Sequence, residues 1–169
     1  APRGPGGWVE DQSQAWPTQG HFEWLQAAGY GQETYRNSTA GLDNTIWRKF
    51  ITAPDALRQR MVLALSEICV VSVLGVGGPW RQFAVANFLD ILERNAFGNY
   101  RTLLGEITLS SAMGYYLTYR GNAKANNRGS QPDENYAREL MQLFTIGLVG
   151  LRPDGTPAPG APESYGPDD

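Results

Sequence analysis

Apolar residues recur every three or four positions along most of the chain, which is the spacing of amphipathic helices. Segments rich in glycine or proline interrupt this pattern and separate the predicted helices. We place helices at residues 21–28, 41–51, 54–74, 79–95, 99–109, 111–119 and 131–149. In the second helix, Ile46, Trp47 and Phe50 share one side, and only residues 70–76 approach the alternation of a strand. We therefore expect an all-α protein, a compact multi-helix bundle of about six to seven helices.

The two ends of the chain are rich in glycine and proline and show no periodicity. Because such segments do not form regular structure, the predicted organisation has three parts. An irregular N-terminal arm covers residues 1–18, a helical domain covers 19–151, and a Pro/Gly-rich segment covers 152–169. Asp168 and Asp169 are typical of a helix start, so we expect the sequence to be the first part of a longer protein.

The predicted helix at residues 131–149 carries an unusually wide apolar arc, which indicates packing on most of its sides. Ser130 and Asp133 form a capping pattern at its start. Glu139 falls inside the apolar arc. Because a buried carboxylate without a partner is costly, we expect Glu139 to be neutral or paired with a cation.

The predicted helix at residues 54–74 has a similar inward charge. Arg58 lies within its apolar face and Arg60 flanks that face. Our hypothesis is that Arg58 or Arg60 pairs with Glu139 across two helices. Such a buried pair is more often architectural than catalytic, but charge clusters in a dry interior also occur at catalytic sites. Both interpretations remain open at this point.

Charge and composition exclude several classes of function. The formal net charge is −3, with no run of like charges, so we expect no nucleic-acid partner. No apolar run approaches the ~20 residues that cross a bilayer, so we expect no membrane span. The single Cys69 cannot form an internal disulfide, and the single His21 excludes sites built from several Cys or His ligands. We therefore predict no metal and no cofactor.

Residues 132–148 read PDENYARELMQLFTIGL, a motif long enough to be specific. It resembles the signature of a bacterial family known as domain of unknown function 1800. Residues 55–60 and 95–101, and Asn122 with Lys124, are similar to further blocks of that family.

This resemblance covers residues 20–156 and implies a helical protein of bacterial origin. Family members resemble secreted or periplasmic proteins and are usually much longer, so the expected location is the periplasm or the outside of the cell. The chain departs from the family at Ser110-Ser111, where relatives often have His-Pro. A histidine that could act as ligand or catalyst is therefore missing. The family carries no established activity.

A first functional interpretation is a hydrolase that acts on glycosidic bonds, with a carbohydrate as its substrate. That reaction needs two carboxyl groups about 5–10 Å apart, one as acid and one as base or nucleophile. The candidate catalytic residues are Glu134, Glu139, Glu106 and Asp133. Glu139, if buried, suits the general acid, and Glu134, nearer to solvent, suits the ionised partner. Tryptophan and tyrosine rings could stack against sugars.

Geometry limits how these acids can pair. Glu134 and Glu139 lie about 140° apart around a helix, so they do not face one cleft. A pair that includes Glu106 or Asp90 from another helix is easier to build. The residues expected to support the structure or orient a substrate are Arg58, Arg60, Arg138, Asn122 and Lys124.

A second functional interpretation is a non-catalytic helical module, which binds a protein partner or supports an exported assembly. In this interpretation the motif at residues 132–148 determines the fold. A capped helix start is followed by Glu134 and Arg138 at i,i+4 spacing, which stabilises a helix. This module needs no active site.

Overall fold

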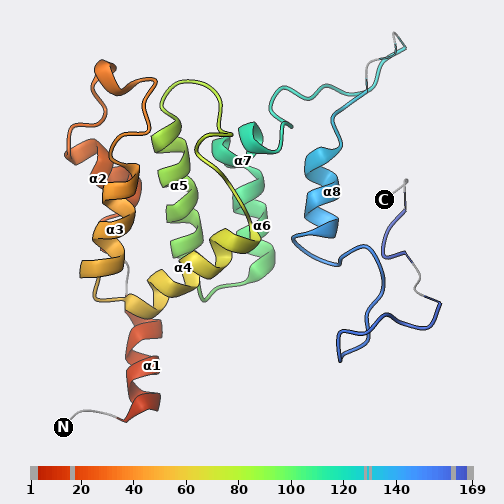
Figure 1. Ribbon diagram of the computed structural model, residues 1–169, viewed down its shortest axis with the longest axis horizontal. Helices are drawn as coiled ribbons and strands as arrows, with labels where there is room; N and C mark the ends of the chain where they lie inside the picture. Colours follow the sequence, from red (N-terminus) through yellow and green to blue (C-terminus); the bar gives the residue numbers. More distant parts are fainter. Residues whose placement is uncertain (1–3, 16–17, 128, 130, 161–162, 167–169) are drawn as a thin grey trace. The chain divides into compact units, whose positions relative to one another are not determined.

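The computed structural model describes residues 4–15, 18–127, 129, 131–160 and 163–166. These residues form eight α-helices and no strand, which confirms the predicted all-α class (Figure 1). The β-type pairings among the described residues are two isolated bridges, Val149 with Glu163 and Leu151 with Pro157. The helices are α1 (Pro5–Gln14), α2 (His21–Ala27), α3 (Leu42–Thr52), α4 (Ala56–Ile68), α5 (Arg81–Arg94), α6 (Tyr100–Thr108), α7 (Ser111–Tyr116) and α8 (Asn135–Gln142), with a 3₁₀ helix η1 (Glu33–Tyr35).

The chain divides into two compact units, unit 1 at Ala1–Tyr116 and unit 2 at Leu117–Asp169. This division differs from the predicted single helical domain at 19–151. The boundary falls directly after α7, so α8 alone belongs to unit 2 while the seven preceding α-helices belong to unit 1.

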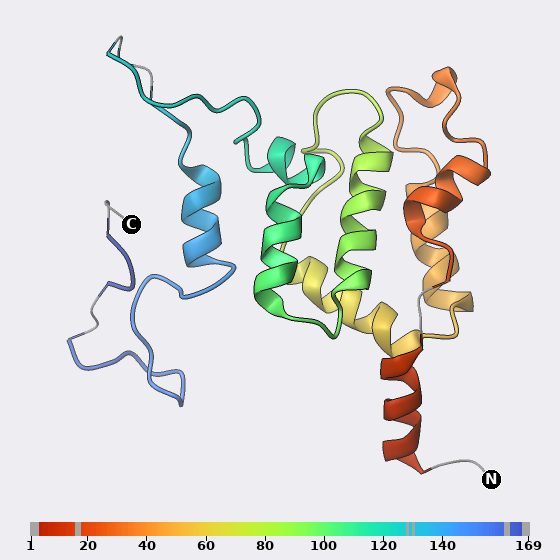
Figure 2. The ribbon, with the colours of Figure 1, turned by 180° about the vertical axis from the view of Figure 1, so that it is seen from behind.

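Helix α5 is the centre of unit 1. It contacts α2 and α3 on one side and α6 and α7 on the other, and α4 crosses it (Figures 1 and 2). The buried residues of α5 are Gln82, Phe83, Val85, Ala86, Phe88, Ile91, Leu92 and Glu93. Because a helix covered by neighbours on several sides buries most of its circumference, even polar positions of α5 become part of the core.

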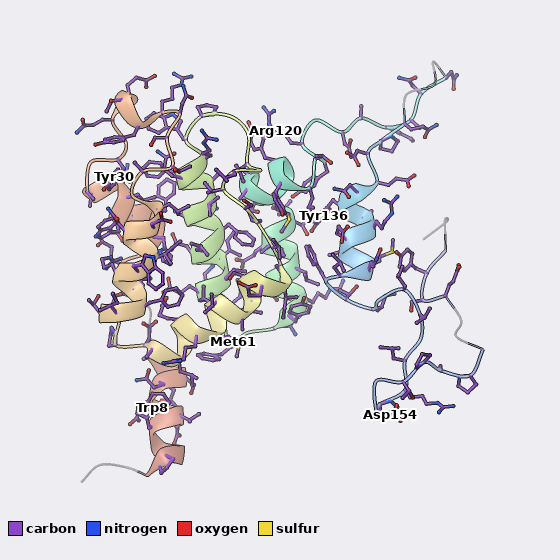
Figure 3. All side chains as sticks on the ribbon, in the orientation of Figure 1. Trp8, Tyr30, Met61, Arg120, Tyr136 and Asp154 are labelled. Atoms are coloured by element: carbon purple, nitrogen blue, oxygen red, sulfur yellow. The ribbon has the colours of Figure 1, made fainter. Side chains whose placement is uncertain are left out.

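Helix α1 corrects the prediction of an irregular N-terminal arm. Pro5 lies at its first turn, where proline is tolerated because the N–H there has no helical partner. The helix buries no side chain, and Trp8 lies on it with 49 % exposed (Figure 3). Gln12 instead attaches α1 to the start of α4, since its side chain donates to the Pro54 carbonyl at 3.0 Å and accepts from the Leu57 N–H at 3.3 Å.

Two helices of unit 1 differ in detail from their predictions. Helix α4 ends at Ile68, so residues 69–76 are irregular and not the end of a helix. In α3, Leu42, Thr45 and Lys49 are buried, and Trp47 is 63 % exposed. Ile46 and Phe50, predicted to share a side with Trp47, are half-buried. Two polar residues of α3, Thr45 and Lys49, therefore face the core of unit 1.

Unit 2 contains a short helix rather than the predicted one at 131–149. The Asp133 carboxylate accepts the N–H of Asn135 at 2.9 Å, where α8 begins. The helix ends after Gln142, and Gly147 has a left-handed φ of 76°. Tyr136 lies on α8 (Figure 3). Its ring packs against that of Tyr119, with the centroids 4.4 Å apart and the planes tilted by 39°. The capping role predicted for Ser130 falls outside the described residues.

Candidate functional site

A buried ion pair joins α3 to α5. The Lys49 ammonium lies 2.5 and 2.6 Å from the two carboxylate oxygens of Glu93, and both residues are at most 2 % exposed. The Gln59 side-chain amide on α4 donates to the same carboxylate at 2.5 Å. Burial of two charges is tolerable when they are paired and hydrogen-bonded. Three helices therefore meet at one satisfied carboxylate.

Arg58 is buried, as predicted, but its partners differ from the hypothesis. Its guanidinium lies 3.6 Å from the Asp55 carboxylate, so the acid beside it is Asp55 and not Glu139. It also donates to the backbone carbonyls of Ala15 and Glu93, both at 3.0 Å. Arg60, the other proposed partner of Glu139, is exposed. Arg58 thus holds the end of α1 and the end of α5 against α4, which is an architectural role.

His21 and Asp90 form a third part of this buried network. The Asp90 carboxylate accepts the N–H groups of His21 at 2.6 Å and Phe22 at 3.0 Å, and so satisfies the first turn of α2. Burial raises the pKa of Asp90, although these two hydrogen bonds oppose that shift. The His21 ring is 3.2 Å from the Thr45 hydroxyl. Burial, together with the charges of Lys49 and Arg48, lowers the pKa of His21 to about 3.

Potential metal ligands come together here. One ligand atom each of His21, Asp90 and Glu93 lies within 4.8 Å of the others. The Lys49 ammonium already rests on both oxygens of Glu93, so a metal ion would compete with it. Asp90 and Glu93 also line a cleft of about 440 Å³ with Glu23. Sequence reasoning did not assign a role to Glu93 or Lys49. Two acids at i,i+3 spacing, Asp90 and Glu93, within the apolar run of residues 88–92 and its end were a usable signal.

Unit 2 brings a different set of acids together. A cleft of about 630 Å³ is lined by Glu134, Arg138, Glu163 and Tyr165 and by apolar side chains. The Arg138 guanidinium is 3.7 Å from the Glu134 carboxylate, which confirms the predicted i,i+4 pair. Glu163 is a lining residue that sequence reasoning missed, because it lies 29 positions from Glu134 in a segment without a pattern.

The family comparison adds to this geometry. The family model described as "Protein of unknown function (DUF1800)" matches residues 2–169. This chain belongs to the DUF1800 family. No curated protein and no solved structure matches it. The match confirms the resemblance drawn from the motif at residues 132–148, and its description states no activity. Within the described residues of this DUF1800 chain, no helix has the length and apolar character to cross a membrane.

Two other predicted site residues of this DUF1800 chain, Glu106 and Glu139, differ in their surroundings. Glu106 on α6 accepts hydrogen bonds from Arg94 at 2.6 Å and from Asn95 at 3.0 Å. Glu139 is half-buried, and its Oε2 atom has no hydrogen-bond partner among the described residues. Glu139 does not line the cleft that contains Glu134. The structure therefore does not bring together the pair of Glu134 and Glu139.

Asp133 and Asn122 form a closed arrangement in unit 2. The Asn122 side chain donates to the Asp133 carbonyl at 2.7 Å and accepts the Asp133 N–H at 3.0 Å. The Asp133 carboxylate accepts from the Thr118 hydroxyl at 2.5 Å and from the Asn135 N–H. These hydrogen bonds lower the pKa of Asp133, which suits a structural anion and not a general acid. Lys124, between Asn122 and Asp133 in the chain, is exposed.

Proposed function

We propose that this DUF1800 chain is a hydrolase that acts on glycosidic bonds through carboxyl groups in the cleft of unit 2. The observation that supports this proposal is that Glu134 and Glu163 line the same cleft of about 630 Å³. Two carboxyl groups in one cleft are the minimum machinery for this reaction. A volume of several hundred Å³ is also of the order that accommodates a small ligand.

The roles are assigned from the charge beside Glu134. Glu134 is exposed and lies 3.7 Å from the positive charge of Arg138, which suits the base. Glu163 then serves as the acid: it protonates the glycosidic oxygen as the C–O bond breaks. Glu134 removes a proton from the attacking water, whose oxygen forms the new bond to the sugar carbon. Tyr165 offers a ring against which a sugar can stack.

The test is hydrolysis of chromogenic glycosides by the purified chain, with chromogenic esters as a comparison. Glu134→Gln and Glu163→Gln should each lower the rate about 100- to 10,000-fold, the usual contribution of a general acid or base. Glu67→Gln, an exposed acid in unit 1, is the matched control and should keep the wild-type rate. Two results contradict the proposal. Either the three variants release the chromophore at the same rate, or the wild-type chain releases it no faster than buffer alone.

A second candidate is a helical module that binds a protein partner. It is favoured by four large apolar side chains that are more than half exposed around the end of α8: Leu143, Ile146, Leu148 and Leu151. Patches of this kind often mark interaction sites. A chain without hydrolytic activity, in which Glu134→Gln lowers the melting temperature, would support this module instead.

The location belongs to the same proposal. The family resemblance implies a secreted or periplasmic protein, which suits a hydrolase of extracellular carbohydrate. Fractionation of the native cells, with an antibody to this chain, should find it outside the cytoplasm. Recovery in the cytoplasmic fraction, together with a cytoplasmic marker enzyme, would contradict this location.

A further inference from the structure

We propose that Asn122 is a positioning residue for Glu134, because it fixes the backbone immediately before this acid. The inference rests on the proposed function. The side-chain amide of Asn122 forms hydrogen bonds with both backbone groups of Asp133. It donates to the carbonyl at 2.7 Å and accepts from the N–H at 3.0 Å. An amide can donate and accept at once, so this one side chain satisfies residue 133 from both sides.

The Asp133 side chain extends the same arrangement. Its carboxylate accepts from Thr118 on one side and from the Asn135 N–H on the other. Asp133 is therefore held through four hydrogen bonds. Glu134 lies between Asp133 and Asn135, and its own carbonyl accepts the N–H of Arg138 at 2.9 Å. The backbone of Glu134 is consequently fixed on both sides.

The carboxylate of Glu134 remains available for chemistry. Its side chain is 76 % exposed and has Arg138 at 3.7 Å. A fixed backbone limits where this carboxylate can lie, which matters for catalysis because a displacement of about 1 Å can reduce a rate about 100-fold. The four hydrogen bonds around Asp133 are themselves in exposed positions. These bonds hold the backbone at Asp133 in one place, and so they also fix where the neighbouring Glu134 lies.

The experiment measures hydrolysis by Asn122→Ala. We expect kcat to fall about 10- to 100-fold, while KM changes less than about twofold because the cleft itself is intact. Asn127→Ala is the matched control, since Asn127 is an exposed residue of the same loop, and it should keep the wild-type kcat. Asn122→Asp keeps an acceptor for the Asp133 N–H but sets a carboxylate oxygen against the Asp133 carbonyl, so its kcat should fall at least as far as that of Asn122→Ala.

A double variant separates positioning from general damage. In the Glu134→Gln background, Asn122→Ala should cause no further loss of rate, because its effect passes through Glu134. A further 10-fold loss, or a wild-type kcat in Asn122→Ala, overturns the inference and leaves the proposed hydrolase in place. A wild-type chain that hydrolyses no substrate overturns both. Circular dichroism spectra that superimpose for all variants exclude unfolding as the cause.

Discussion

The buried imidazole of His21 makes the stability of unit 1 depend on pH. Burial and the nearby charges of Lys49 and Arg48 lower the pKa of His21 from 6.5 to about 3. Between these two values the unfolded chain binds a proton that the folded chain does not. Stability therefore falls as the pH falls through this window. Each pH unit within this window lowers the free energy of unfolding by about 1.36 kcal/mol. Between pH 6.5 and pH 5 the loss is therefore about 2 kcal/mol.

Urea denaturation followed by tryptophan fluorescence can measure this loss. All five tryptophans lie within residues 1–116, so the signal reports on unit 1. The wild-type chain should lose about 2 kcal/mol more than His21→Asn between pH 7 and pH 5. Asp90 acts in the opposite direction, because its raised pKa makes protonation favour the fold, but it is present in both proteins and cancels. Equal pH dependence in the two proteins would refute this reasoning.

Two further substitutions test the core of unit 1. Lys49→Met leaves the Glu93 carboxylate buried without its cation and should cost about 3–5 kcal/mol, measured from the urea midpoint. Adding Glu93→Gln should recover part of this loss, and a double variant less stable than the single one would contradict the pairing. Gly41→Ala should cost at least about 1 kcal/mol more than Gly29→Ala. Both glycines have φ above 80°, but only at Gly41 would a Cβ lie 2.6 Å from the Tyr30 ring. Equal melting temperatures for the two alanine variants would contradict this clash.

Helix positions were predictable where local chemistry sets them. Residues 21–28 were predicted as a helix that stops before Gly29, and α2 ends at Ala27 with Gly29 at a left-handed φ of 87°. Helix α1 was missed because Gly6 and Gly7 have low helix propensity, and its contact with α4 outweighs that preference. Tertiary contacts of this kind have no local signature.

The length of α8 shows the opposite error. The apolar residues of 143–149 extended the predicted helix, because periodicity alone does not show whether a segment is packed. In the structure Leu143 and Ile146 are exposed and the chain turns at Gly147. Gly147 lies four residues beyond the C-cap Leu143, so no glycine directly after α8 signals its end at Gln142.

The candidate sites depend on partners that are distant in sequence. Arg58 was correctly predicted to be buried, yet the partner assigned to it was wrong, because a helical wheel gives the direction of a side chain and not what lies opposite. Lys49 was missed for the same reason, since its carboxylate lies 44 residues later on α5. Glu134 was identified from its motif, but Glu163 has no pattern around it.

The close approach of Gly20 to Asp90 limits which residues homologues can have at these two positions. A Cβ at Gly20 would lie 3.1 Å from both oxygens of the Asp90 carboxylate. Any shift of those oxygens away from Gly20 changes the hydrogen bonds that they accept from the N–H groups of His21 and Phe22. Homologues with a larger residue at position 20 should therefore have a shorter one at position 90. The two positions are expected to covary during evolution, although 70 residues separate them.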